Sequence, residues 1–208
     1  MKKLIHYKLF LLLTIILSCQ SSSPYKKIEN PNVPFERPGY TILPPAGADW
    51  EYYSDEMKDR YHLNFLKKIH GSDSHSLMVG LIETQNAASF ENPQEFKKFM
   101  QSTVEMAMYS NKLRSLDKNI ELDDKFGLYT LKYYMKAEDR RSVGSGNEAF
   151  LILANYGYVF IHPNIPKLII QVSYSERGRP ADIRPDLEQE AEIFFNGIMI
   201  RKTPVFNQ

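Results

Sequence analysis

The chain has 208 residues and a formal net charge of +1, with 43% apolar and 25% charged residues. These values are typical of a globular protein with a substantial core. Acidic residues nearly balance the basic ones, whose doublets are short and scattered, and this argues against the clustered positive surface that nucleic-acid binding requires. The single cysteine excludes an internal disulfide, so we expect the fold to be held together by packing alone.

The first nineteen residues have the pattern of a bacterial export signal. Three lysines precede an apolar run at 9–17, which is far shorter than the roughly 20 residues of a permanent membrane helix. The run ends in Ile16-Leu17-Ser18-Cys19, which resembles the lipobox of bacterial lipoproteins. The resemblance implies that residues 1–18 are removed and that Cys19 carries a diacylglycerol and an N-acyl chain, with no other cofactor. An ordinary secretory signal followed by an incidental cysteine is the alternative.

Residues 19–38 are predicted to form a flexible tether beyond the lipidated cysteine. They contain a run of serines and four prolines, which remove backbone donors and favour extended chain. At about 3 Å per residue, this tether would let the domain stand several nanometres from the membrane. Gln20, rather than an aspartate, follows the cysteine. In enteric-type bacteria this pattern resembles lipoproteins passed to the outer membrane, which implies an outer-membrane anchor that faces the periplasm.

In the next part of the chain, the pattern of apolar residues first indicates short strands and then changes to helical spacing. Strands are expected at 39–43, 50–53, 61–65 and 76–84. Asn92 can cap a helix, Pro93 suits the first helical position, and Glu95 completes a capping-box pattern. Apolar residues at helical spacing then predict that this helix continues to about residue 110.

The second half of the chain has the pattern of an antiparallel meander followed by a helix. Strands are expected at 119–122, 126–136, 149–154, 158–162 and 168–174, with a turn at 155–157 and loops at 138–147 and 176–184. A helix at 185–196 ends at Gly197 and precedes a short strand at 198–202. The predicted fold class is therefore α+β, an antiparallel sheet of about seven strands packed with two amphipathic helices. A single domain is expected at 39–202, with a C-terminal tail at 203–208.

The order of these elements resembles the PsbP/DcrB-like superfamily. The similarity begins with Gly39-Tyr40-Thr41-Ile42, a proline-rich turn and Trp50, and it continues through the element order to about residue 202. Ala48-Asp49 and an extra turn stand before Trp50, where the family has a tighter Pro-Gly-Trp pattern. Members are mostly non-enzymatic binding or assembly proteins, several of them attached to membranes. The resemblance implies a sandwich fold and that functional class, without naming a partner.

One polar turn carries residues of the types that bind transition metals. His70 and His75, with Asp73 between them, are side chains that zinc or copper would accept. Structural zinc sites usually take four ligands from fixed elements, so a turn without a metal is the preferred interpretation.

His162, with Ser175 and Glu176 further along, raises the possibility of a hydrolase relay. If the strands around Pro163–Pro166 form a hairpin, His162 lies near Lys167 or Leu168 at one end. Ser175 then lies at the opposite end, whereas a relay needs contacts of about 3 Å. The sequence also lacks a Gly-x-Ser-x-Gly elbow. This arrangement argues against a serine hydrolase.

The best remaining candidate is an interaction surface. Tyr174, Arg177 and Arg179 are expected where a strand passes into a loop, and Arg140 and Arg141 in a long Gly-Ser hairpin are possible companions. Tyrosine and arginine dominate protein–protein hot spots.

These observations favour a lipid-anchored, non-enzymatic binding or assembly factor of the cell envelope, with the membrane and an envelope protein as partners. An envelope hydrolase or a small-ligand carrier is the alternative. A deep cavity with converging polar groups would favour the alternative, whereas a flat surface would favour the assembly factor.

Overall fold

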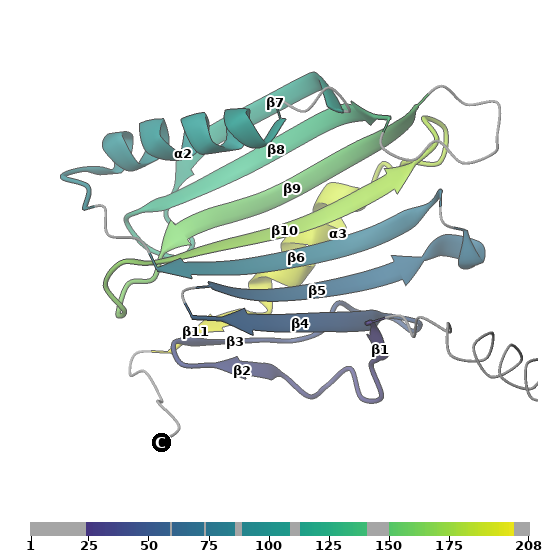
Figure 1. Cartoon of the computed structure of the whole chain (residues 1–208), viewed down its shortest axis with the longest axis horizontal. Coiled ribbons are helices and arrows are strands. Elements are labelled where there is room, and N and C mark those ends of the chain that lie inside the picture. Colours follow the sequence, from purple (N-terminus) through teal and green to yellow (C-terminus); the bar gives the residue numbers. More distant parts are fainter. Residues whose placement is uncertain are drawn as a thin grey trace, which may run out of the picture.

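The computed structural model describes residues 24–58, 60–72, 74–85, 89–108, 113–140 and 150–201, with the backbone alone for residues 103–108. A large sheet of eight antiparallel strands has the order β1-β4-β5-β6-β10-β9-β8-β7 (Figure 1). Its strands are β1 Lys26–Lys27, β4 Glu51–Met57, β5 Arg60–Lys68, β6 Ser76–Gln85, β7 Leu113–Asp123, β8 Thr130–Asp139, β9 Leu151–Ile161 and β10 Leu168–Gly178.

A second, smaller sheet lies beside the β1–β4 edge and has the order β11-β3-β2. Its strands are β2 Phe35–Arg37, β3 Tyr40–Ile42 and β11 Ile198–Ile200. The helices of the described residues are α2 Pro93–Met108 and α3 Leu187–Asn196, with a short 3-10 turn, η1, at Ile69–Gly71. These elements confirm the antiparallel α+β class and the two helices. The large sheet has eight strands where about seven were predicted.

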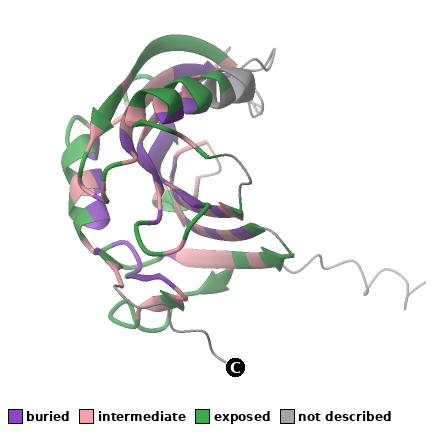
Figure 2. Ribbon diagram, turned by 90° about the vertical axis from the view of Figure 1, so that its left-hand side faces the viewer, coloured by how far each residue is buried: buried purple, intermediate pink, exposed green. Residues whose placement is uncertain are grey.

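The two helices cover opposite faces of the large sheet. Leu187, Ala191, Phe194 and Phe195 of α3 pack on the face that carries the main core. Other members of that core are Leu63, Phe65, Val79, Leu81, Ile170 and Val172. Phe96 and Met100 of α2 pack on the other face, against a smaller cluster formed by Leu131, Val159 and Ile169. Buried residues, purple in Figure 2, alternate with less buried ones along β5 and β6, whereas β9 and β10 contain runs of consecutive buried residues.

The start of α2 follows the sequence pattern closely. The backbone N–H of Glu95 donates to Asn92 Oδ1 at 3.0 Å, and the Glu95 carboxylate accepts from the backbone N–H of Glu91 at 3.0 Å. Asn92 therefore caps the helix as predicted, whereas the Glu95 carboxylate binds the N–H of Glu91, one residue before the N–H that a capping box uses. At the other helix, the backbone N–H of Gly197 donates to the Phe194 carbonyl at 2.9 Å, as expected for its end.

The predicted turn at 155–157 is wrong, because β9 runs through it without interruption. Gly157 lies opposite Tyr133 on β8 and Ser173 on β10. A Cβ at Gly157 would overlap the Tyr133 ring and the Val172 carbonyl oxygen. Glycine is present here because a neighbouring ring lies directly over the backbone, not because the chain turns.

The tether prediction also needs correction, because the fold begins before residue 39. Lys26 and Lys27 pair with Tyr52 and Glu51 as β1, and β2 pairs with β3. The Phe35 ring contacts the rings of Tyr52 and Phe65, with centroids 5.0 and 5.3 Å apart. Pro31, Pro34 and Pro38 lie in connections between short strands, so residues 20–25 alone separate Cys19 from the first strand.

Within the described ranges, no helix has both the length and the apolar character needed to cross a membrane.

Candidate functional site

The structure describes two of the three candidate metal ligands in the polar turn, His70 and His75. His75 Nε2 lies 2.8 Å from Glu176 Oε1 on β10. His70 has a positive φ of 51° inside η1, and Asp73 lies outside the described residues. No three His, Cys, Asp or Glu side chains of the described chain come together as a ligand set.

The predicted interaction surface is wrong for two of its residues. Tyr174 and Arg177 are only 4% and 8% exposed, because β10 continues to residue 178 instead of ending at 174. Arg177 Nε donates to Asp139 Oδ2 at 2.8 Å in the interior. Arg179 is exposed and is bound to Asp182, and Arg140 is exposed and is bound to Glu138. Arg141 lies outside the described residues.

His162 and Ser175 lie at opposite ends of the β9–β10 hairpin, as predicted. The His162 backbone N–H donates to the Leu168 carbonyl at 2.8 Å, whereas Ser175 is paired with Asn155. His162 Nδ1 accepts from the backbone N–H groups of Asn164 and Ile165, so Nε2 is the donor to the Gly39 carbonyl at 2.8 Å. The ring therefore joins this turn to the start of β3.

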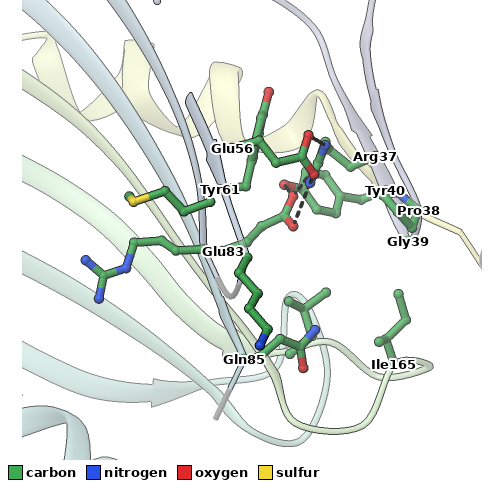
Figure 3. Close-up of a pocket in the computed structure, with 13 residues that line it drawn as sticks. Arg37, Pro38, Gly39, Tyr40, Glu56, Tyr61, Glu83, Gln85 and Ile165 are labelled. Carbon is green, nitrogen blue, oxygen red and sulfur yellow. Dashed lines mark hydrogen bonds and ion pairs between the residues drawn. The ribbon is translucent and has the colours of Figure 1, made fainter. Parts of the chain in front are cut away.

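A small polar cavity of about 190 Å³ lies where the two sheets meet (Figure 3). Arg37 of β2 reaches Glu83 of β6, with 2.8 Å between Nε and Oε1, and Glu56 of β4 at 3.2 Å. The Tyr40 hydroxyl donates to Glu83, and the Arg37 guanidinium lies 3.7 Å from the Tyr61 ring centroid. Burial, together with the charge of Glu83, raises the pKa of Tyr40 well above its usual value.

The arrangement around Arg37 is best explained as a joint between sheets. The buried Glu83 carboxylate accepts from both Arg37 and Tyr40, so its charge is compensated within the protein. A buried ion pair of this kind loses stability when one partner is removed.

A larger cavity of about 530 Å³ lies between α3, the β3–β4 segment and the adjoining ends of β5 and β6. We name it the Trp50 groove. Its apolar wall includes Leu43, Pro44, Trp50, Ile69, Leu77, Ile193 and Phe194. Its polar lining includes Lys67, Tyr174, Arg184 and Glu190. Cavities of this size, with apolar walls and few polar groups, are the usual form of small-molecule sites.

The polar groups of the Trp50 groove are held in fixed positions. Arg184 Nη1 and Nη2 donate to the two Glu190 oxygens at 2.6 and 2.8 Å, and the Tyr174 hydroxyl donates to Glu190 at 3.0 Å. The hydrogen bonds from Arg184 and Tyr174 lower the pKa of Glu190. Burial and the charge of Glu190 raise the pKa of Tyr174. The cluster is thus fixed as carboxylate, guanidinium and neutral phenol.

This electrostatic state decides what the groove can do. A general base needs a pKa near the working pH and a free lone pair toward its substrate. Glu190 has a lowered pKa and donors on both oxygens, so it is unsuited to that role. The cluster can instead orient the polar end of a molecule whose apolar part lies along Trp50 and Ile193.

Sequence reasoning did not find this groove. Trp50 was assigned to a strand and to the family resemblance, Arg184 to a loop, and Tyr174 to an exposed interaction surface. A weak signal was present, because Arg184 stands six residues before Glu190, across the start of a helix. Tertiary structure decides the rest. It brings Arg184 of that loop to Glu176 on β10, and it places the β3–β4 segment beside α3.

Comparisons with known proteins leave the family open. No family model matches the chain. No curated protein matches it either. The structure is similar to the solution structure of cyanobacterial PsbP (CyanoP) from Synechocystis sp. PCC 6803, at 8% identity and a TM-score of 0.32. That similarity covers 74% of this chain and 94% of the cyanobacterial chain. A TM-score this low does not establish a shared fold, so the PsbP/DcrB-like assignment stays a prediction.

Proposed function

We propose that the protein is a lipid-anchored envelope protein with a PsbP/DcrB-like domain that binds a small amphipathic ligand. The anchor is Cys19, acylated and placed in the outer membrane so that the domain faces the periplasm. Support for the anchor comes from the sequence, in which the only cysteine follows an apolar run of signal-peptide length. Two or three acyl chains would make such attachment effectively permanent.

The Trp50 groove is the observation that carries the binding role. Its apolar wall surrounds a cluster of Arg184, Glu190 and Tyr174 that is already fixed, so a ligand would meet a site that needs little ordering. Of the functions considered from the sequence, this favours a small-ligand carrier over an assembly factor that acts through a flat surface. It also favours binding over hydrolysis, because Glu190 is unsuited as a base.

The anchor is tested by metabolic labelling with an alkyne fatty acid in the source bacterium. Wild-type protein is expected to be labelled and to sediment with membranes, and Cys19→Ser is expected to be unlabelled. Ser18→Ala is the matched control, because it keeps a small residue before the cysteine and should be labelled normally. Undiminished labelling of Cys19→Ser would contradict the proposal.

The groove is tested with the amphipathic fluorophore 1-anilinonaphthalene-8-sulfonate, using Trp50 as the energy donor. Trp50 is the only tryptophan and lines the groove, so energy transfer reports occupancy there. Ile193→Gln and Leu43→Gln alter rim residues that are 60% and 37% exposed, and each is expected to weaken binding about tenfold by loss of apolar contact. Leu128→Gln, at a 69% exposed residue outside the groove, is the control. Equal binding by groove and control variants would contradict the proposal.

A further inference from the structure

The first strand of the fold follows Cys19 closely. Only residues 20–25 separate the cysteine from Lys26, where β1 begins. Fully extended chain spans at most 3.3–3.6 Å per residue, so this segment reaches about 25 Å. The large sheet has eight strands, and at about 4.8 Å between neighbours its two edges are about 34 Å apart. The linker is therefore shorter than the sheet is wide.

This difference in length restricts how the domain can stand on a membrane. β1 and β7 form opposite edges of the large sheet, and α2 packs beside β7 (Figure 1). A domain standing on its β7 edge would hold β1 about 34 Å from the bilayer, beyond the reach of the linker. Of the two orientations that place a sheet edge toward the bilayer, only the one on the β1 edge is within the reach of the linker.

We propose that the corner formed by residues 26–34 rests on the bilayer that holds the acylated Cys19. We name it the β1 corner. The proposal depends on the lipid anchor of the proposed function, and its occupant is the phospholipid surface itself. It goes further by assigning one side of the domain to the membrane and the opposite side, with α2, to the periplasm.

The side chains of the β1 corner suit a phospholipid surface. Lys26 and Lys27 are exposed on the edge strand of the large sheet, where they can meet anionic headgroups. Val33 is 56% exposed at the tip of a turn. The turn is fixed by Asn30, which accepts from the backbone N–H groups of Asn32 and Val33. Glu29 is the exposed acid of the corner, so the lysines leave a net positive charge.

Positive charge alone would not make the β1 corner the membrane-facing part of the domain, because α2 carries a comparable pair of lysines. Lys97 and Lys98 lie on the helix at the far edge of the sheet. The length of the linker distinguishes the two lysine pairs, because an orientation on the α2 and β7 edge would place β1 beyond the reach of the linker.

The β1 corner also forms part of the Trp50 groove. Pro31 and Asn32 belong to the corner and line the groove. With the corner on the bilayer, the groove opens beside the headgroups. An amphiphile could then pass between the membrane and the groove without its apolar part crossing water, which assigns the ligand to the membrane amphiphiles.

The test uses acylated full-length protein in vesicles of phosphatidylethanolamine and phosphatidylglycerol that contain a headgroup-labelled nitroxide lipid. Because Cys19 is acylated, an introduced cysteine is the only free thiol. Val33→Cys and Lys98→Cys are each labelled with bimane. We expect the nitroxide to quench bimane at position 33 several-fold more than at position 98. Equal quenching, or stronger quenching at position 98, would overturn the proposal.

A variant with a longer linker tests whether linker length causes this orientation of the domain. Ten Gly-Ser residues inserted after Gln20 extend the reach of the linker beyond the width of the sheet, so the difference between positions 33 and 98 should shrink. An undiminished difference would show that the linker does not set the orientation. The mass of the purified protein, measured by mass spectrometry, shows whether Cys19 is acylated. Protein without acyl chains would overturn both the anchor and this inference. Acylated protein without preferential quenching at position 33 overturns this inference alone.

Discussion

Arg184 compensates both Glu190 and the fully buried Glu176. Its Nη atoms donate to the two Glu190 oxygens at 2.6 and 2.8 Å, and its Nε donates to Glu176 Oε1 at 3.1 Å. One guanidinium therefore joins the surface of the Trp50 groove to the interior of the sheet. His75 is the other side chain that the structure places on Glu176.

Replacement of Arg184 is expected to destabilise the fold. Arg184→Met leaves the Glu176 carboxylate without its guanidinium, and loss of one partner from a buried pair costs about 3–5 kcal/mol. Urea denaturation should show this loss in the free energy of unfolding. Arg179→Met is the matched control in the same loop, because the Arg179 side chain is 57% exposed and its pair with Asp182 should contribute less than about 1 kcal/mol. Equal losses in the two variants would contradict the role given to Arg184.

The Glu190 contacts predict an acid dependence of stability. The pKa of Glu190 is lowered below its usual 4.5 by Arg184 and Tyr174, so the carboxylate stabilises the fold above that pH. The contribution is lost as the pH falls below 4.5 through the folded-state value. Thermal unfolding of wild type and Glu190→Gln between pH 7 and pH 3 should give Tm values that converge in acid. A Tm difference that stays constant over this range would contradict the prediction.

Gly157 predicts a steric coupling across two strands. Gly157→Ala places a Cβ against the Tyr133 ring and should cost about 1–3 kcal/mol of unfolding free energy. In the Tyr133→Leu background the ring is absent, so the added cost should be smaller, as a double-mutant cycle would measure. Gly80→Ala is the control, because its Cβ would meet the Ser173 hydroxyl at 3.2 Å, a group that can rotate away. Additive effects of the two substitutions would contradict the coupling.

Arg37 is expected to hold the smaller sheet against the larger one. Arg37→Met removes the cation from the buried Glu83, and we expect a loss of about 3 kcal/mol. Tyr40→Phe removes one hydrogen bond to the same carboxylate and should cost about 1–2 kcal/mol. Urea denaturation compares the two variants. Hydrogen exchange should locate the Arg37→Met effect in β2, β3 and β11, and protection unchanged there would contradict this role.

The sequence by itself determined the features that depend on local chemistry. Asn92 starts α2 because its side chain satisfies a free N–H group in the first turn of the helix. Alternating apolar residues correctly placed most strands, because neighbouring side chains on a strand face opposite sides of a sheet. The separation of His162 from Ser175 also followed from a short proline-containing turn.

Only the tertiary structure decided the features that depend on neighbours distant in sequence. In the sequence, Gly157 has the pattern of a turn residue and Arg177 that of a loop residue. Only the folded chain places Tyr133 over Gly157 and Asp139 beside Arg177. The sequence of residues 26–37 indicates a tether. In the folded chain, β4 and β3 supply hydrogen-bonding partners to its two short strands. Backbone pairing and burial are set by what lies across the sheet, and a linear pattern does not contain that information. The Trp50 groove arises in the same way, from segments that meet only in the folded chain.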